Sequence, residues 1–285
     1  MSFDIKVKNP ICKNLQLKIY DGIANSIKKL DVYNKKTYKS QLAKEVMDGQ
    51  EDPILAARKY NRLVCFYEAC HKLKDNNADP NKILDIDQEW FNKFTRISED
   101  ISSEEMQKMW SEILAREAET PGSFSIKALK ILEELDKAIA NLFNRLCSCC
   151  LVFRVDKEII DAKVCSLDGT AGNNSLINFG LGFTDLNLLE EYGLITSDYN
   201  CWREFRYSAE ATDIDCSITS CLSNYILDKK DNVDSNLKIY GVQLSKVGKE
   251  LLPIVNTKEN DRYFNKLNKY LEPKGFEIKR SNNDL

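Results

Sequence analysis

The chain has 285 residues, of which 43% are hydrophobic and 30% are charged. This composition excludes disorder as the default and predicts a sizeable core, in two domains of ordinary size or one large one. The 41 basic and 44 acidic residues nearly balance, which excludes a strongly basic protein. The charge is unevenly spread, with eleven acids and four bases over Thr184–Asn236 but ten bases and six acids over Leu237–Leu285. This pattern fits either an anionic partner at the C-terminal end or two solvated surfaces of one domain.

The apolar runs are too short to cross a membrane. A membrane span needs roughly 18 consecutive apolar residues, and the best candidate, Leu142–Phe153, is interrupted by Arg145. The N-terminus lacks the apolar core of a signal peptide. We therefore expect a cytoplasmic protein without a membrane partner, whose ten cysteines are mostly reduced.

The N-terminal part is predicted to be helical. Residues 1–50 are interpreted as a weakly ordered or arm-like start, with a short helix over Lys35–Asp48. A longer helix over Asp52–Lys74 has an Asp-Pro start, which is a typical helix N-terminus. The next helix begins at Asp85 or Asp87, and the short connections favour an antiparallel helical array.

The stretch Ile101–Leu135 has a complete set of helix boundary signals. Ser102 and Glu105 form a capping box for a helix whose apolar face is centred on Trp110. Pro121-Gly122 ends this helix, and a second amphipathic helix follows the turn. The turn is expected near the junction of two domains, residues 1–122 and 123–285.

This segment of two helices joined by the Pro121-Gly122 turn is similar to segments of known protein families. The runs Met106–Glu117 and Pro121–Ser125 resemble a bacterial family catalogued as domain of unknown function 2806 and, more distantly, the abortive infection alpha proteins of phage defence. The similarity continues through Phe183–Ile195 and Leu244–Leu251 and covers roughly residues 85 to 275, apart from the cysteine-rich run after Leu146 and the insert between Ser208 and Asn236. The resemblance implies a Trp-centred helix before a small C-terminal domain and makes a defence role an expectation, without implying catalytic residues. Its structural signature here is Trp110, Leu114, Glu117, Pro121 and Gly122.

Helices and strands alternate in the predicted C-terminal domain. Helices are expected over Ser125–Leu135 and Asp136–Leu151, and a short helix capped by Thr184 ends at Gly193. The expected strands are Glu158–Cys165, Glu204–Ser208 and Leu237–Leu244. Two further helices are expected over Ser245–Val255 and Asn260–Leu271. This order is typical of a winged helix. The predicted fold is therefore mainly α, an N-terminal helical array followed by a winged-helix-like α+β domain.

Two kinds of partner are compatible with a winged helix. The helix in the recognition position has three acids and no Lys or Arg, so it would repel the phosphates that supply most DNA-binding affinity. Protein contact is therefore favoured for that helix. A second, basic face suits nucleic acid or another partner and consists of Lys246, Lys249, Lys258, Arg262, Lys266 and Lys269. The same pattern is also found on any solvated amphipathic helix.

Candidate metal and phosphate sites have simpler interpretations. Cys147, Cys149 and Cys150, with Cys165 downstream, suggest zinc, but C-x-C-C on a predicted helix spreads the thiols around its axis. We favour buried thiols that pack as small hydrophobes. The loop Asp168–Gly172 is glycine-rich but lacks the Lys-Ser/Thr ending of a P-loop, so it is interpreted as a turn.

Candidate catalytic groups are equally sparse. His71 is the single histidine, and its neighbour Cys70 points about 100° away on the predicted helix. A metal-dependent hydrolase needs two or three converging carboxylates. The most prominent one, Glu117, is expected instead to accept backbone N–H groups at the start of the Ser125 helix. The sequence therefore assigns no catalytic, cofactor-binding or metal-binding residues.

These observations favour a non-enzymatic protein-interaction or sensor module, with a protein partner or self-association, in bacterial anti-phage defence. The alternative is a nucleic-acid-binding winged-helix regulator that uses the C-terminal basic face.

Overall fold

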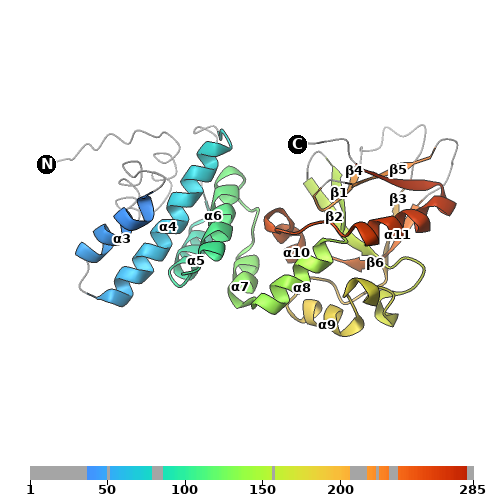
Figure 1. Cartoon of the computed structure of the whole chain (residues 1–285), viewed down its shortest axis with the longest axis horizontal. Coiled ribbons are helices and arrows are strands. Elements are labelled where there is room, and N and C mark those ends of the chain that lie inside the picture. The colour runs from blue at the N-terminus through green and yellow to red at the C-terminus, as the bar shows by residue number, and fades with distance from the viewer. Residues whose placement is uncertain are drawn as a thin grey trace. The chain divides into compact units, whose positions relative to one another are not determined.

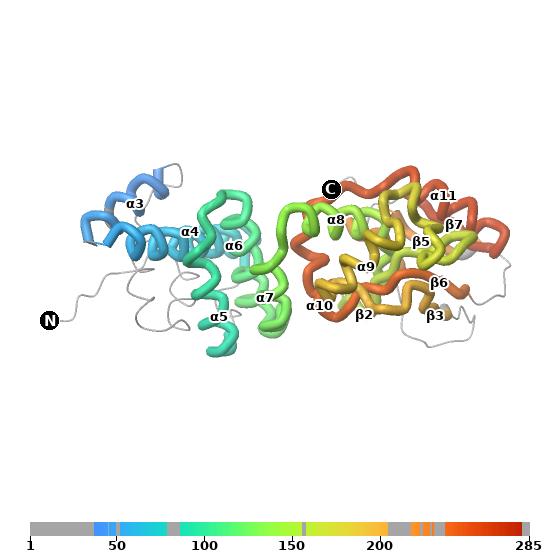
Figure 2. Tube along the Cα trace, turned by 90° about the horizontal axis from the view of Figure 1, so that it is seen from below, coloured from blue at the N-terminus to red at the C-terminus, as the bar shows by residue number. Residues whose placement is uncertain are grey.

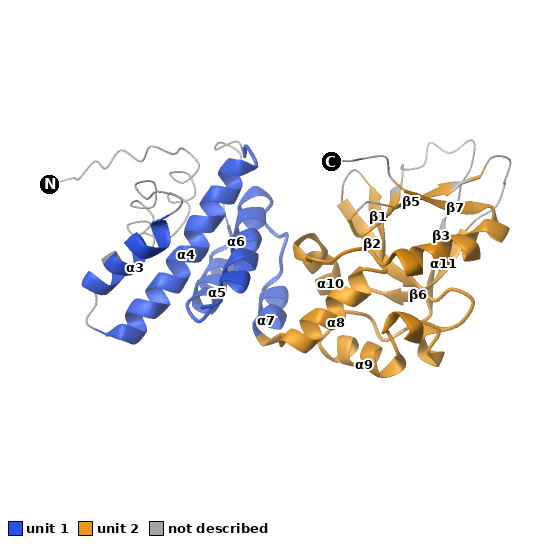
Figure 3. Ribbon diagram, viewed as in Figure 1, with its two compact units in different colours: residues 1–133 blue, residues 134–285 orange. Residues whose placement is uncertain are grey.

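The computed structural model describes residues 37–49, 52–78, 86–155, 158–205, 217–222, 225–230 and 237–280. The chain folds into two compact units, residues 1–133 and 134–285 (Figure 3). This boundary follows Glu133, whereas the sequence placed a junction near the Pro121-Gly122 turn. The predicted arm-like start lies outside the described residues up to residue 36, as does most of the insert after Ser208.

The described part of the first unit is helical (Figure 1). Its elements are α3 (Tyr38–Asp48), α4 (Pro53–Asp75), α5 (Gln88–Ser98), α6 (Glu104–Glu119) and α7 (Ile126–Glu134). Asp52 and Asp87 cap α4 and α5, because their carboxylates accept backbone N–H groups of the first turn. The expected capping box at Ser102 is wrong, since Ser103 is the N-cap of α6 and accepts from the Met106 N–H.

Aromatic side chains form the core of the helical unit. Trp90 stacks on Phe94 with ring centroids 5.3 Å apart, and Phe94 lies 5.4 Å from Trp110. Trp110 is fully buried, and α6, the helix that carries it, packs against α4. The Trp90 indole N–H donates to the Phe124 carbonyl oxygen at 2.7 Å, so the segment after α6 is fixed to the core.

The second unit is built on a seven-stranded antiparallel sheet in the order β3-β6-β2-β1-β4-β5-β7. The strands are β1 (Leu151–Val155), β2 (Glu158–Cys165), β3 (Cys201–Phe205), β4 (Ser217–Ser220), β5 (Tyr225–Lys229), β6 (Leu237–Gln243) and β7 (Phe276–Arg280). The helices are α8 (Lys137–Cys147), α9 (Phe183–Glu191), α10 (Lys246–Leu251) and α11 (Asp261–Leu271), and the 3-10 turns are η3 (Ala171–Asn173), η4 (Ile177–Phe179), η5 (Leu252–Ile254) and η6 (Glu272–Lys274).

Helix α11 packs along β7, its neighbour in the chain (Figures 1 and 2). Phe264 of α11 stacks on Tyr225 of β5 with ring centroids 4.6 Å apart. The Tyr263 hydroxyl donates to the Cys165 carbonyl oxygen at 3.0 Å. These contacts bury one face of α11 and leave Arg262, Lys266 and Lys269 exposed.

The prediction of a mainly α protein with a winged-helix-like C-terminal domain is wrong, because a wide antiparallel sheet forms the core of that unit. Three of the strands that were not expected, β4, β5 and β7, have only four or five residues, too few for an alternating pattern to stand out. The fourth, β1, begins at Leu151, the residue at which the expected helix Asp136–Leu151 ended. After α9, Ile195 forms only an isolated bridge with Leu244.

Candidate functional site

Strand β2 places two opposite charges inside the second unit. Asp161 and Lys163 are two residues apart, so their side chains point to the same face of the sheet. Only 2% of Asp161 and 0% of Lys163 is exposed. A buried charge is costly unless partners compensate for its lost hydration. The neighbouring strands therefore have to supply these partners.

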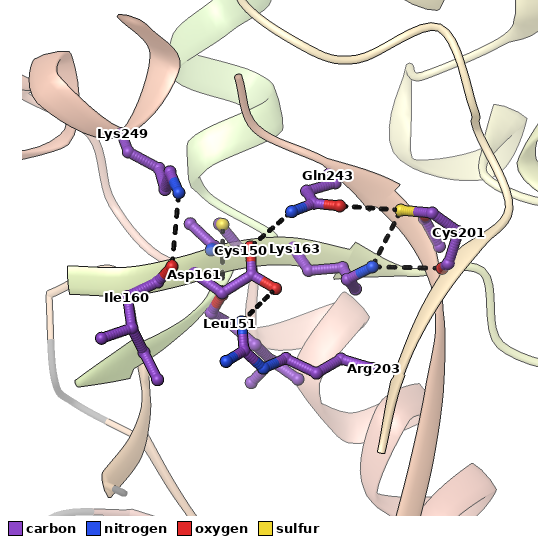
Figure 4. A network of polar contacts seen from close by, with 11 residues as sticks. Cys150, Leu151, Ile160, Asp161, Lys163, Cys201, Arg203, Gln243 and Lys249 are labelled. Carbon is purple, nitrogen blue, oxygen red and sulfur yellow. Dashed lines mark hydrogen bonds and ion pairs between the residues drawn. The ribbon is translucent and has the colours of Figure 1, made fainter. Parts of the chain in front are cut away.

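Asp161 has three hydrogen-bond donors (Figure 4). Arg203 Nη1 of β3 lies 3.0 Å from Oδ2, and Gln243 Nε2 of β6 lies 3.0 Å from Oδ1. The Ala162 backbone N–H also donates to Oδ1, at 2.9 Å. The carboxylate is thus paired with a guanidinium and held by two further donors, which connects three adjacent strands.

Lys163 is compensated differently, by a cysteine. Its Nζ lies 2.9 Å from Cys201 Sγ and 3.1 Å from the Cys201 carbonyl oxygen. Within the described ranges, no carboxylate lies at ion-pairing distance from this ammonium. Cys201 Sγ is also 3.2 Å from Gln243 Oε1 and 3.3 Å from the Gly241 carbonyl oxygen. We call Asp161, Lys163, Cys201, Arg203 and Gln243 the β2–β3 network.

Gly241 permits the close approach of the strands at this point. It pairs with Cys165 of β2 on one side and with Cys201 of β3 on the other. A Cβ at this position would lie 1.9 Å from the Val164 carbonyl oxygen, far inside van der Waals contact. Only glycine therefore fits here without displacing β6 from β2.

The side of β3 opposite Cys201 and Arg203 carries an exposed aromatic pair. Trp202 is 54% exposed and pairs across the strands with Tyr240, which is 37% exposed. Lys238 Nζ lies 4.7 Å from the Trp202 ring centroid, and Glu204 lies 3.9 Å from the same ammonium. We call Trp202, Tyr240, Lys238 and Glu204 the Trp202 surface. It lies at an end of the strand order, on β3 and its neighbour β6.

The predicted basic residues do not act as one group. On α10, Lys246 lies 3.8 Å from Glu250, and Lys249 Nζ donates to the Ile160 carbonyl oxygen at 3.3 Å. On α11, Arg262 Cζ and Lys266 Nζ lie 6.0 and 5.9 Å from the Phe179 ring centroid. Lys258 and Lys269 are exposed.

A third cation joins the two on α11. The exposed Arg145 of α8 donates through Nη1 to the Gly180 carbonyl oxygen at 3.1 Å, next to Phe179. We call Arg145, Arg262 and Lys266 the basic cluster. None of the three makes an ion pair with a described carboxylate. The sequence had marked Arg145 only as a break in an apolar run.

The expected structural signature belongs to the first unit. Trp110 and Leu114 are fully buried, and Glu117 is 1% exposed. Glu117 accepts backbone N–H groups beyond the Pro121-Gly122 turn, from Gly122 at 2.6 Å and from Phe124 at 3.0 Å. These donors precede α7 rather than belong to its first turn, where Ser125 caps instead. Gly122 has φ +87°, which glycine adopts without strain.

The cysteines around α8 are buried free thiols. Burial raises the pKa of Cys149 and of Cys165 to about 12, and it raises the pKa of Cys147 and of Cys150 well above the usual value. Among the described residues, no three His, Cys, Asp or Glu side chains are arranged to hold a metal ion.

The other candidates have structural surroundings. His71 lies against the Tyr67 ring, 4.4 Å between ring centroids. The Asp168–Gly172 loop leads into η3, where Asn174 Oδ1 accepts from the Phe183 N–H at the start of α9. The N-cap of α9 is Gly182 rather than the expected Thr184.

A protein-family model matches most of the chain. The model described as "Protein of unknown function (DUF2806)" matches residues 66–268. The chain belongs to this family. The DUF2806 match contains the β2–β3 network, the Trp202 surface and the basic cluster, and it ends one residue before Lys269. No curated protein and no solved structure matches the chain. Of the described helices, none combines the length and apolar character of a membrane span.

Sequence reasoning missed the β2–β3 network and the Trp202 surface. A signal for the first was present, since Asp161 and Lys163 are charges at alternate positions of a strand that is apolar elsewhere after Glu158. Their partners could not be assigned, because Cys201, Arg203 and Gln243 are 38 to 82 residues away in the chain.

Proposed function

We propose that this DUF2806 protein is a non-catalytic interaction module that binds a protein partner through the Trp202 surface. The observation that carries the proposal is the exposure of Trp202, a large side chain that usually lies mostly buried, on a strand at the end of the sheet. Exposed Trp and Tyr side chains are typical anchors of protein interfaces.

The β2–β3 network supports this role because it fixes the strand that carries Trp202. Cys201 and Arg203, on either side of Trp202 in the sequence, are tied to Lys163 and Asp161 on the buried face. Alternation along β3 then turns Trp202 to the opposite face. An anchor on a rigid strand loses little conformational freedom on binding, which favours affinity.

The biological setting is part of the proposal. The similarity of Met106–Glu117 and Pro121–Ser125 to abortive infection alpha proteins supports a role in bacterial anti-phage defence. The described cysteines are free thiols, which fits a reducing, cytoplasmic compartment.

The test compares complexes recovered from the native host. Tagged wild-type protein should co-purify with one partner, or with a second copy of itself, at fixed stoichiometry. The Trp202→Ala/Tyr240→Ala variant should lose that complex. Phe183→Ala is the matched control, because Phe183 is 46% exposed on α9 of the same unit. Absence of a complex with wild type, or the same complex with the double variant, would refute the proposal.

Nucleic-acid binding through the basic cluster is the second candidate. Arg145, Arg262 and Lys266 converge on the Phe179–Gly180 segment without an acidic partner in the described part of the chain. Such a cluster would contact phosphates, so the affinity should fall steeply with salt.

Fluorescence anisotropy with single-stranded and duplex oligonucleotides tests this candidate. Lys266→Glu should weaken binding and lower the salt dependence. Lys246→Glu makes the same charge change on α10 and should have little effect. Salt-insensitive binding, or equal loss in both variants, would eliminate the basic cluster as the contact site.

A further inference from the structure

The contact between Lys163 and Cys201 brings together two side chains that can react with each other. Of the described cysteines, Cys201 and Cys221 are partly exposed, and the others are buried. Of these two, Cys201 has an amine nitrogen in contact with its sulfur, 2.9 Å away. Cys221 has no lysine hydrogen-bonded to it in the described structure, and burial raises its pKa to about 11.

We propose that Cys201 and Lys163 form an oxidant-responsive pair, in which peroxide converts the contact into a reversible sulfur–nitrogen bond between β3 and β2. The chain supplies both reacting groups, and hydrogen peroxide is the oxidant. The inference does not depend on the identity of a binding partner.

The first step makes a sulfenic acid. The Cys201 thiol gives its proton to solvent as its sulfur attacks one oxygen of hydrogen peroxide, so an S–O bond forms, the O–O bond breaks and hydroxide leaves. The Lys163 ammonium, in hydrogen-bond contact with the sulfur, gives a proton to that hydroxide, which departs as water. Sulfur is oxidised by two electrons, peroxide is reduced, and the lysine becomes a neutral amine.

The second step closes the bond. The Lys163 nitrogen attacks the Cys201 sulfur, so an S–N bond forms and the S–O bond breaks. The leaving hydroxide takes the excess proton of nitrogen, and a second water is released. The sum is one thiol, one amine and one peroxide giving a sulfenamide and two waters. Two equivalents of an added thiol reverse it, restoring the cysteine and the lysine and forming the added thiol's disulfide.

The surroundings favour this product over further oxidation of sulfur. Lys163 is completely buried, and its Nζ is held by both the sulfur and the carbonyl oxygen of Cys201. Gln243 Oε1 and the Gly241 carbonyl oxygen, at 3.2 and 3.3 Å from the sulfur, are placed to accept the Cys201 S–H and hold the sulfur beside Lys163. The amine is thus already in place when the sulfenic acid forms, an advantage of proximity over any solute. The bond would join β2 to β3 across β6.

Tryptic mapping after peroxide treatment tests the pair. The chain has no Lys or Arg between Lys163 and Arg203, so digestion of the reduced protein releases a peptide that begins at Val164 and contains both Cys165 and Cys201. In the oxidised full-length protein, trypsin should no longer cleave after Lys163. The product should be the peptide of residues 158–203, lighter by two hydrogen atoms, and dithiothreitol should restore cleavage.

Two variants separate the alternatives. Cys201→Ser should abolish the protection from trypsin, whereas Cys165→Ser should retain it. A Cys165–Cys201 disulfide would show the same loss of two hydrogens but would leave the Lys163 site cleavable. The inference is overturned if cleavage after Lys163 is unaffected by peroxide, or if protection persists in Cys201→Ser.

Discussion

Glu117 provides the sharpest test of how the helical unit is held together. Replacing it with alanine removes the acceptor of the Phe124 N–H, and Phe124 is only 1% exposed. An orphaned buried donor costs about 1–3 kcal/mol. The Gly122 N–H is at an exposed residue, so water replaces much of that bond, and we add about 1 kcal/mol for losing a charged acceptor. Glu117→Ala should therefore lower the free energy of unfolding by about 2–4 kcal/mol.

Glu117→Gln should cost about half as much, because its single amide oxygen can accept from one of the two donors. Urea unfolding followed by tryptophan fluorescence measures both, in a Trp202→Phe background where Trp90 and Trp110 report on the helical unit. Glu119→Gln is the matched control on the exposed side of the same last turn. If Glu117→Ala is no more destabilising than this control, the capping role is wrong. The capping role is also wrong if Glu117→Gln abolishes a biological activity without any change in melting temperature.

Further predictions concern the second unit. Asp161→Asn should lower the free energy of unfolding by about 1–3 kcal/mol. This loss is smaller than for a fully buried ion pair, because the guanidinium of Arg203 is 38% exposed. A change in unfolding free energy below about 0.5 kcal/mol, measured with urea, would contradict this prediction. Gly241→Ala should abolish the dispersed amide NMR signals of the second unit. Gly172→Ala is the control and should preserve them, because nothing lies within 4 Å of its added Cβ. Equal spectra for the two variants would contradict the prediction. Stability should fall as pH rises from about 9 to 12, because the unfolded thiols of Cys149 and Cys165 deprotonate near 9.0 while the folded ones resist until about 12. The slope, measured by unfolding at each pH, should decrease in Cys149→Ala, and an unchanged slope would count against it.

The sequence predicted local elements well where a helix or strand carries its own boundary signals. Strand β2 begins and ends at the expected residues, Glu158 and Cys165. Ser245 caps α10 through its bond from the Gly248 N–H, and Gly193 has the left-handed φ of +70° that was expected after α9. Each of these features depends on side chains within a few residues, which a single sequence displays directly.

The sheet could not be predicted, because its strands pair with partners far away in the sequence. β1 pairs with β4 through Leu151 and Ser220, and β2 pairs with β6 through Lys163 and Gln243. No short window contains both partners, and strands of four or five residues have weak patterns of their own. The candidate site shared this difficulty, because Lys163 acquires its meaning only from Cys201 on another strand.

The strand order also constrains how the polypeptide is made. The described part of the first unit consists of helices that contact near neighbours in the chain, so this part can fold while synthesis continues. The sheet cannot form this early, because β5 pairs with β7 and β2 pairs with β6, and both partners are synthesised later. Until those strands are made, the β1–β2 hairpin has two open edges, which favour pairing with strands of other chains. Slowing translation after β2 should therefore lengthen its exposure and favour aggregation, whereas a pause after α7 should be harmless.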